Sequence, residues 1–170
     1  MAIDDHPLIV KSIAWTTEAD TQAFAAALAA KLQAGTAERN LLIELHGDLG
    51  SGKTTFARHL LTSLGVTGRV KSPTYAVVEA YTVDVATAGA PLALDIWHFD
   101  FYRFNNPDEW EEAGFRDIFA SPGLKLVEWP EKAGDHLPAA DLNIAIELLE
   151  GDVRAVTLTA RSAAGAALLP

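Results

Sequence analysis

The sequence contains no cysteine, which excludes a disulfide-stapled scaffold, a thiolate metal site and a cysteine nucleophile. It also lacks any uninterrupted apolar run near the ~18 residues that a membrane-spanning helix needs. The N-terminal segment carries Asp4, Asp5 and His6 before any apolar run, so it lacks the basic start of a secretory signal peptide. From these absences we expect a cytoplasmic protein that does not enter a membrane.

Basic residues are few, and they are fewest in the second half of the chain. The 170 residues include 13 Lys and Arg against 23 Asp and Glu, which gives a net charge of −10. Residues 84–152 hold 15 of the acids and only 4 of the bases. Because clustered Lys and Arg hold nucleic-acid backbones, this composition argues against a tightly held nucleic acid. The acidic half is either a solvated surface or a face that docks on a basic protein partner.

The length of the chain and its 49% hydrophobic content are typical of one globular domain, which we expect to span residues 1–170. Strand and helix patterns alternate through the middle, so the sequence predicts an α/β three-layer sandwich with a mainly parallel central sheet. Two apolar segments around Glu150 and Gly151 predict a C-terminal antiparallel hairpin. The predicted strands are 41–45, 92–101, 124–127, 143–149 and 153–159, with an extended segment at 75–81. The predicted helices run from a cap at Thr17 to Gly35, over 54–64 and over 107–113.

Residues 47–54 read G-D-L-G-S-G-K-T and match the phosphate-binding pattern G-x-x-x-x-G-K-S/T, between a predicted strand and a predicted helix. In such a loop the backbone N–H groups and the helix N-terminus converge on a phosphate. We therefore expect Lys53 to bridge the β- and γ-phosphates and Thr54 to offer its hydroxyl to Mg²⁺. The expected nucleotide-binding residues are Asp48, Leu49, Gly50, Ser51, Gly52, Lys53, Thr54 and Thr55. The fold prediction is accordingly that of a P-loop NTPase.

Two acidic residues follow predicted strands, at the sheet edge where ligands of open parallel sheets bind. Glu128 ends the more apolar of the two runs, so we assign it to the metal, directly or through water. Asp100 is then the residue that polarises the attacking water or holds a metal-bound one. With Lys53, these two acids are the expected catalytic residues. The alternative for each acid is a strand-end carboxylate that caps the next helix or faces solvent.

The remaining patterns separate classes of nucleotide-binding protein. None of the twelve Asp residues has Gly three positions later, which argues against a GTPase. A small-molecule kinase stays open, because Asp100 and Arg103 have the spacing of an acceptor-side acid with a phosphate-facing arginine. No Arg-rich lid follows them, however. A non-hydrolytic binding module, in which MgATP only orders a loop, is the second alternative.

Four separated motifs occur in one order: H-G-D-L-G-S-G-K-T-T at 46–55, K-S-P-T-Y at 71–75, H-F-D-F-Y-R at 98–103 and V-E-W-P at 127–130. In order and spacing they resemble the TsaE family, once called YjeE, over residues from about 40 to 130. The resemblance implies a bacterial ATPase that works with TsaB and TsaD in forming threonylcarbamoyladenosine beside the tRNA anticodon. It implies ATP and Mg²⁺ as cofactors and contact with tRNA only through the complex.

The resemblance also implies roles for residues outside the phosphate loop. Ser72, Thr74 and Tyr75 resemble a switch loop that senses the γ-phosphate. Trp129 resembles a residue near the nucleotide or on the partner surface, and Thr21 lines up with a family hydroxyl residue near adenine. Each of these assignments is an expectation for the structure to test.

For four further side chains the sequence leaves alternative roles open. Arg103 is either an internal contact to the γ-phosphate or half of an ion pair with the acidic helix. His46 and His98 are expected as satisfied strand-end histidines rather than catalytic bases. Tyr102 is either a core aromatic residue or part of the site.

Overall fold

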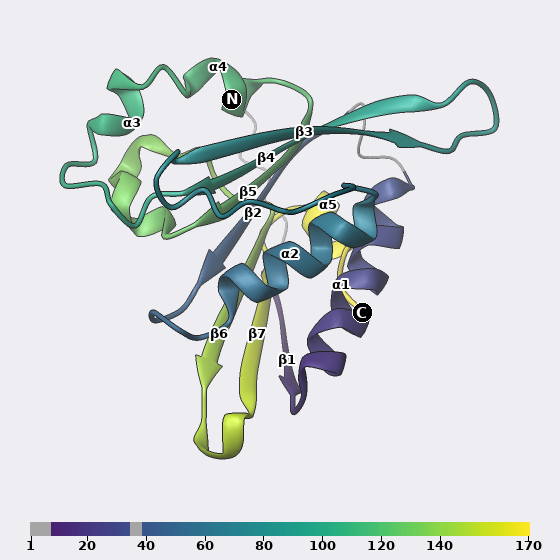
Figure 1. Ribbon diagram of the computed structural model, residues 1–170, viewed down its shortest axis with the longest axis vertical. Coiled ribbons are helices and arrows are strands. Elements are labelled where there is room, and N and C mark those ends of the chain that lie inside the picture. The colour runs from purple at the N-terminus through teal and green to yellow at the C-terminus, as the bar shows by residue number, and fades with distance from the viewer. Residues whose placement is uncertain (1–7, 35–38) are drawn as a thin grey trace.

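The computed structural model describes residues 8–34 and 39–170, and its centre is one seven-stranded mixed sheet (Figure 1). The strand order is β1-β7-β6-β2-β5-β4-β3. The strands are β1 (Ile9–Trp15), β2 (Asn40–His46), β3 (Val78–Val85), β4 (Leu92–Asp100), β5 (Gly123–Glu128), β6 (Leu142–Leu148) and β7 (Arg154–Ala160). The acidic N-terminal residues and the predicted helix end at Gly35 lie outside the described residues.

The sheet is parallel in its centre and antiparallel at both margins. β6, β2, β5 and β4 run parallel to one another, as the sequence predicted for the centre. The predicted C-terminal hairpin is confirmed, with β6 and β7 antiparallel around the turn η2 (Glu150–Asp152). The margins were not predicted: β1 pairs antiparallel with β7, and β3 pairs antiparallel with β4. The prediction of a mainly parallel sheet therefore holds for the four central strands only.

Helices cover both faces of the sheet. One face carries α1 (Glu18–Gln33), α2 (Lys53–Leu64) and α5 (Ala163–Ala166), and the other carries α3 (Glu109–Glu112), α4 (Arg116–Ala120) and η1 (Pro130–His136). Successive residues of a strand point to opposite faces, so β2 contributes side chains to the hydrophobic cores on both faces of the sheet. Leu41, Ile43 and Leu45 pack in the larger core under α1 and α2. Leu42 packs in the smaller, aromatic core under α3, α4 and η1.

The first helix begins at the predicted cap. The Thr17 hydroxyl accepts from the Asp20 N–H at 3.3 Å, and the Asp20 carboxylate accepts in return from the Thr17 N–H. The inner face of α1 includes the buried residues Ala25 and Ala29, whereas Ala27 is exposed. None of the described helices is long and apolar enough to cross a membrane.

The topology brings three parallel strand ends together. In the register of the sheet, Leu45 of β2 lies opposite Glu128 of β5, and Glu128 lies opposite Asp100 of β4. The loop of residues 47–52 leaves β2 at the same edge and enters α2. The predicted phosphate loop and both predicted acids are therefore neighbours in the fold.

Candidate functional site

The loop of residues 47–52 needs glycine at two positions for steric reasons. Gly47, Gly50 and Gly52 have positive φ angles of 150°, 81° and 108°. A Cβ at Gly47 would lie 2.5 Å from the carbonyl oxygen of Ile146. A Cβ at Gly52 would lie 2.8 Å from Nε of Arg154. The chain can therefore turn from β2 into α2 this tightly only with glycine at these positions.

The N-terminus of α2 faces a pocket and has no side-chain cap. Gly52 is the residue before the helix and supplies no side-chain hydrogen bond to its first N–H groups. Helix N-terminal N–H groups without a partner inside the helix carry a partial positive charge and bind anions. This end of α2 is therefore suited to an anionic group.

Lys53, the first residue of α2, is buried beside this helix end. Its Nζ donates to the carbonyl oxygens of Gly47 and Asp48, the second at 3.0 Å, and lies 4.2 Å from the centre of the Trp129 ring. Burial lowers the pKa of Lys53, while the negative charge of Glu128 opposes that shift. The ammonium group thus rests on neutral acceptors and on an aromatic ring.

Glu128 is held by two partners in the interior. Its Oε1 accepts from the Thr54 hydroxyl at 2.8 Å, and its Oε2 lies 2.6 Å from Nε2 of His98. His98 and Glu128 are both buried, with side chains 0% and 2% exposed. Nδ1 of His98 has no hydrogen-bond partner among the described residues. The imidazole therefore fixes one carboxylate oxygen and leaves the other beside the Thr54 hydroxyl.

Asp100 ends β4 on the other side of the same pocket and is 6% exposed. Its carboxylate accepts from the Tyr102 N–H at 2.9 Å and from the Thr74 hydroxyl at 3.3 Å. Burial raises the pKa of Asp100, and nearby Glu128 adds to that rise. A carboxylate that lines the pocket and has a raised pKa is suited to accepting a proton.

These groups line one pocket of about 290 Å³. It contains most of the predicted site: Leu49, Gly50, Ser51, Gly52, Lys53, Thr54, Thr55, Thr74, Asp100, Glu128 and Trp129. It also contains Tyr102 and Arg154. A hydroxyl and two carboxylates supply the oxygen donors that Mg²⁺ prefers, and Lys53 with the α2 terminus supplies positive charge. The arrangement can hold an anion and a hard cation side by side.

Other predicted site residues lie elsewhere. Asp48 lines a neighbouring pocket beside Glu147 of β6. Thr21 is buried on α1 and does not line the 290 Å³ pocket. Ser72 and Tyr75 line a third, larger pocket on the outer side of the 69–77 segment. Of the three residues predicted for the switch loop, only Thr74 lines the main pocket.

Arg103 is exposed, and its guanidinium lies 4.2 Å from the centre of the Tyr75 ring. It makes no ion pair with α3 or with any other acid of the described residues, so the ion-pair alternative is wrong. It also does not line the 290 Å³ pocket.

Three residues in or beside the pocket could not be assigned from the sequence alone. Arg154 comes from β7 and donates from Nε to the Ser51 carbonyl at 2.8 Å, across 103 positions of sequence. No local pattern marks such a contact. His98 was expected to be fully hydrogen-bonded, but only its Nε2 has a partner, Glu128, while its Nδ1 has none among the described residues. Tyr102 is half-exposed over Trp129, with the ring centres 5.0 Å apart, so it belongs to the pocket wall rather than to the core.

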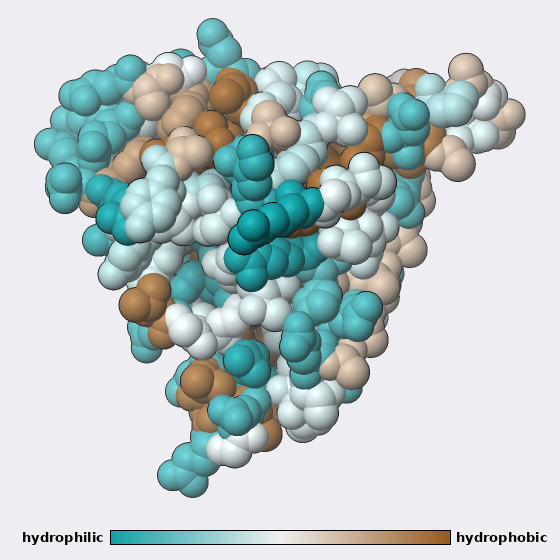
Figure 2. Space-filling model, viewed as in Figure 1, coloured by the Kyte–Doolittle hydropathy of each residue, from teal (hydrophilic) through white to brown (hydrophobic). Residues whose placement is uncertain are grey.

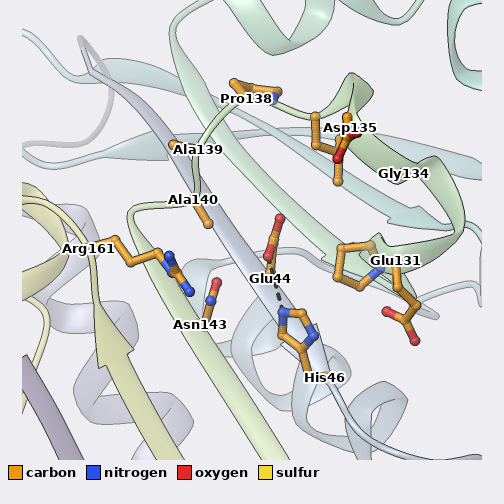
Figure 3. Close-up of a pocket in the computed structure, with 12 residues that line it drawn as sticks. Glu44, His46, Glu131, Gly134, Asp135, Pro138, Ala139, Ala140, Asn143 and Arg161 are labelled. Carbon is orange, nitrogen blue, oxygen red and sulfur yellow. Dashed lines mark hydrogen bonds and ion pairs between the residues drawn. The ribbon is translucent and has the colours of Figure 1, made fainter. Parts of the chain in front are cut away.

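A second polar pocket of about 390 Å³ lies on the far side of the β2 end, under η1 (Figure 3). His46 Nε2 lies 3.1 Å from Oε2 of Glu44. In the amide orientation that satisfies its neighbours, Asn143 donates to Glu44 at 3.1 Å and accepts from Arg161 at 2.9 Å. In the described part of the chain, no group of three or more His, Asp or Glu side chains is placed to hold a metal ion.

The chain is similar to several known proteins. A family model described as threonylcarbamoyl adenosine biosynthesis protein TsaE matches residues 15–156. The chain is 41% identical over 128 residues to the tRNA threonylcarbamoyladenosine biosynthesis protein TsaE of Haemophilus influenzae, covering 75% of each. It is 35% identical over 153 residues to that of Bacillus subtilis, covering 89% of this chain and 87% of the relative. A crystal structure of Bacillus subtilis YdiB superposes with a TM-score of 0.72 at 27% identity, over 96% of this chain and 94% of that one.

Proposed function

This chain belongs to the TsaE family, and from that premise we propose that it binds and hydrolyses MgATP during the formation of threonylcarbamoyladenosine on tRNA. We further propose that it works with TsaB and TsaD and that these partners, not this chain, hold the tRNA. The proposed nucleotide site is the 290 Å³ pocket, in a single domain with the fold of a P-loop NTPase.

One observation carries the proposal: the Thr54 hydroxyl and the Glu128 carboxylate, from α2 and β5, are 2.8 Å apart. A hydroxyl at the start of a helix and a carboxylate at a strand end are the donors that nucleotide-binding proteins offer to Mg²⁺. The two residues are 74 positions apart in sequence, so the fold alone brings them together. The donor set therefore fits the proposed ion.

The anionic side of the site is formed by α2. Its uncapped N–H groups and the Lys53 ammonium converge where the β- and γ-phosphates would lie. Thr54 and Glu128 would hold Mg²⁺ beside the triphosphate, where the ion would neutralise charge that develops on the phosphate oxygens as the γ-phosphoryl group passes to water. Lys53 would leave the Gly47 and Asp48 carbonyls to contact the phosphates, keeping its charge through the reaction.

Asp100 holds the proton-accepting position. Its carboxylate is oriented by the Tyr102 N–H and the Thr74 hydroxyl, so a free lone pair can face a water molecule in the pocket. In this proposal Asp100 orients that water for attack and accepts its proton. Trp129 and Tyr102 form an apolar wall that limits the entry of other water.

One contact also favours the non-hydrolytic alternative. The Thr74 hydroxyl reaches Asp100, so nucleotide binding could order the 69–77 segment without turnover. Asp100→Asn separates the two functions. On our proposal it loses both ATP hydrolysis and the support of tRNA modification. Lost hydrolysis with modification intact would identify a binding module instead.

Calorimetry with MgATP tests the nucleotide site directly. We expect the wild type to bind and Lys53→Ala to bind at least ~50-fold more weakly, because the variant loses a phosphate-contacting cation. Lys31→Ala, on the outer face of α1, is the matched control and should bind as the wild type does. Absence of binding heat in the wild type, or equal affinity of the Lys53 variant, contradicts the proposal. So does a Lys53→Ala chain that supports modification at single-copy expression.

A further inference from the structure

Four cations gather on the outer side of α2 although the protein as a whole is acidic. Arg58 of α2 and Arg69 and Lys71 of the 69–77 segment line one hollow of about 740 Å³. Arg103 stacks on Tyr75, which lines the same hollow and is 84% exposed. We call Arg58, Arg69, Lys71 and Arg103 the basic patch. Figure 2 shows strongly hydrophilic side chains over this region, near the centre of the view.

The charges of the basic patch are not neutralised within the described structure. All four side chains are exposed, and none has a carboxylate within ion-pairing distance among the described residues. Glu79 is the one acid that lines the hollow. Arg116, by contrast, pairs with Glu111 on the other face of the sheet. Unpaired cations on a chain of net charge −10 form a surface to which an anionic partner is attracted.

We propose that the basic patch docks an acidic segment of a partner protein. Nucleic acid fits less well, because a duplex or strand presents a long row of phosphates and needs a continuous basic track. Here the pI is near 4.8, and Arg103 is followed along the chain by the acidic residues Asp108, Glu109, Glu111 and Glu112. A short run of carboxylates can occupy an isolated patch of four cations, and Arg makes paired contacts to carboxylates.

The patch is connected to the main pocket through the 69–77 segment. Thr74 donates to the Asp100 carboxylate at 3.3 Å, and the Asp100 N–H donates to the Val77 carbonyl at 2.9 Å. Val77 is β-branched yet has φ 70°, a strained conformation, and its N–H donates to the Pro73 carbonyl at 2.6 Å. A partner that fixes Arg69 and Lys71 therefore also fixes the position of Thr74 on Asp100. This consequence rests on the proposed function, whereas the docking does not.

The docking is tested by backbone amide NMR with a deca-glutamate peptide at low salt. We expect shifts concentrated at residues 58 and 69–77, extending to the Asp100 amide, and lost at 0.5 M salt. Arg58→Glu/Arg69→Glu should weaken the peptide affinity at least ~10-fold. Lys11→Glu/Lys31→Glu, which changes the net charge equally at exposed positions of β1 and α1, should not. Thermal unfolding of both variants verifies that they are folded.

Three outcomes overturn the proposal: no shifts with the peptide, equal affinity of the patch variant, or a ten-nucleotide RNA that binds the same amides more tightly than the peptide. Measuring ATP turnover in the presence of TsaB and TsaD distinguishes failure of the docking proposal from failure of the proposed function. There, Arg58→Glu/Arg69→Glu should keep the basal rate and lose most of the stimulation. A wild type that does not hydrolyse ATP contradicts the proposed function, while the peptide shifts still decide the docking.

Discussion

Among the described residues, two His–Glu pairs lie near the carboxyl ends of neighbouring strands, and they differ mainly in burial. His98 and Glu128 are 2.6 Å apart with side chains 0% and 2% exposed. His46 and Glu44 are 3.1 Å apart with side chains 37% and 15% exposed. The same two residue types thus form a buried pair beside the 290 Å³ pocket and a partly exposed pair in the 390 Å³ pocket, the second of which is drawn in Figure 3.

The difference shows how burial changes what a pair can do. A buried carboxylate must be fully hydrogen-bonded, and its orientation is then fixed by its partners. Glu128 has both oxygens engaged, one by His98 and one by Thr54. A half-exposed pair is screened by water and contributes little to stability or orientation. We therefore expect Glu128, and not Glu44, to take part in the proposed ATP hydrolysis.

The largest effect is expected when the charge of the buried pair is removed. Glu128→Gln keeps the size of the side chain but removes its negative charge beside Thr54. We expect ATP turnover to fall about 1,000-fold, which corresponds to about 4 kcal/mol of transition-state stabilisation. Glu44→Gln is the matched control and should change turnover less than twofold. Equal losses in the two variants, measured with purified protein, would remove the distinction between the pockets.

A smaller effect, on folding, is expected from removing each histidine. His98→Ala leaves a buried carboxylate with one oxygen unsatisfied, so the free energy of unfolding should fall by about 3 kcal/mol. His46→Ala removes a half-exposed contact and should cost less than about 1 kcal/mol. Urea unfolding of both variants at one pH measures the difference. If His46→Ala proves the more damaging, burial is not what separates the pairs.

The smallest effect concerns Lys125, three residues before Glu128 on β5. Its Nζ is buried, donates to the Asn40 amide oxygen at 2.8 Å and to the Ser121 carbonyl, and has no carboxylate partner among the described residues. Burial lowers the pKa of Lys125 to about 8 from 10.5. Between those pH values the unfolded chain binds more protons than the folded one, so stability should rise with pH.

The expected rise is roughly 2 kcal/mol between pH 8 and pH 10, as the pKa difference sets an upper limit of about 3 kcal/mol. The free energy of unfolding in urea, measured across this pH range, is the test. Lys125→Met should flatten the rise, whereas Lys31→Met, at an exposed site, should leave it. A wild type whose stability falls steadily over the same range contradicts the assignment.

The elements that the sequence predicted well have local causes. The Thr17 cap, the glycine-rich turn and the hairpin around Gly151 each depend on residues within a few positions of one another. β1 was missed because its burial pattern does not alternate; only Trp15 is fully buried. The segment 75–81 was predicted as extended, but β3 begins at Val78, and Tyr75 lies in the preceding turn.

The site divides in the same way. Lys53 and Thr54 follow from the loop pattern, and Asp100 and Glu128 follow from their places at strand ends. Arg154 could not be predicted, because its position opposite Ser51 depends on how the C-terminal hairpin packs on the loop. The basic patch was hidden by counting charge along the chain, since its members are spread over 46 positions from Arg58 to Arg103 and meet only in the fold.

The contacts that Lys53 makes without a ligand affect which anions can bind in the pocket. The ammonium group already has two carbonyl acceptors and the face of Trp129, so an entering anion must replace these contacts before it can bind Lys53. A ligand with several negative charges compensates for the loss of these neutral contacts better than a singly charged ion does. On the proposed function, chloride, bicarbonate and small carboxylates should therefore compete poorly with a triphosphate for Lys53.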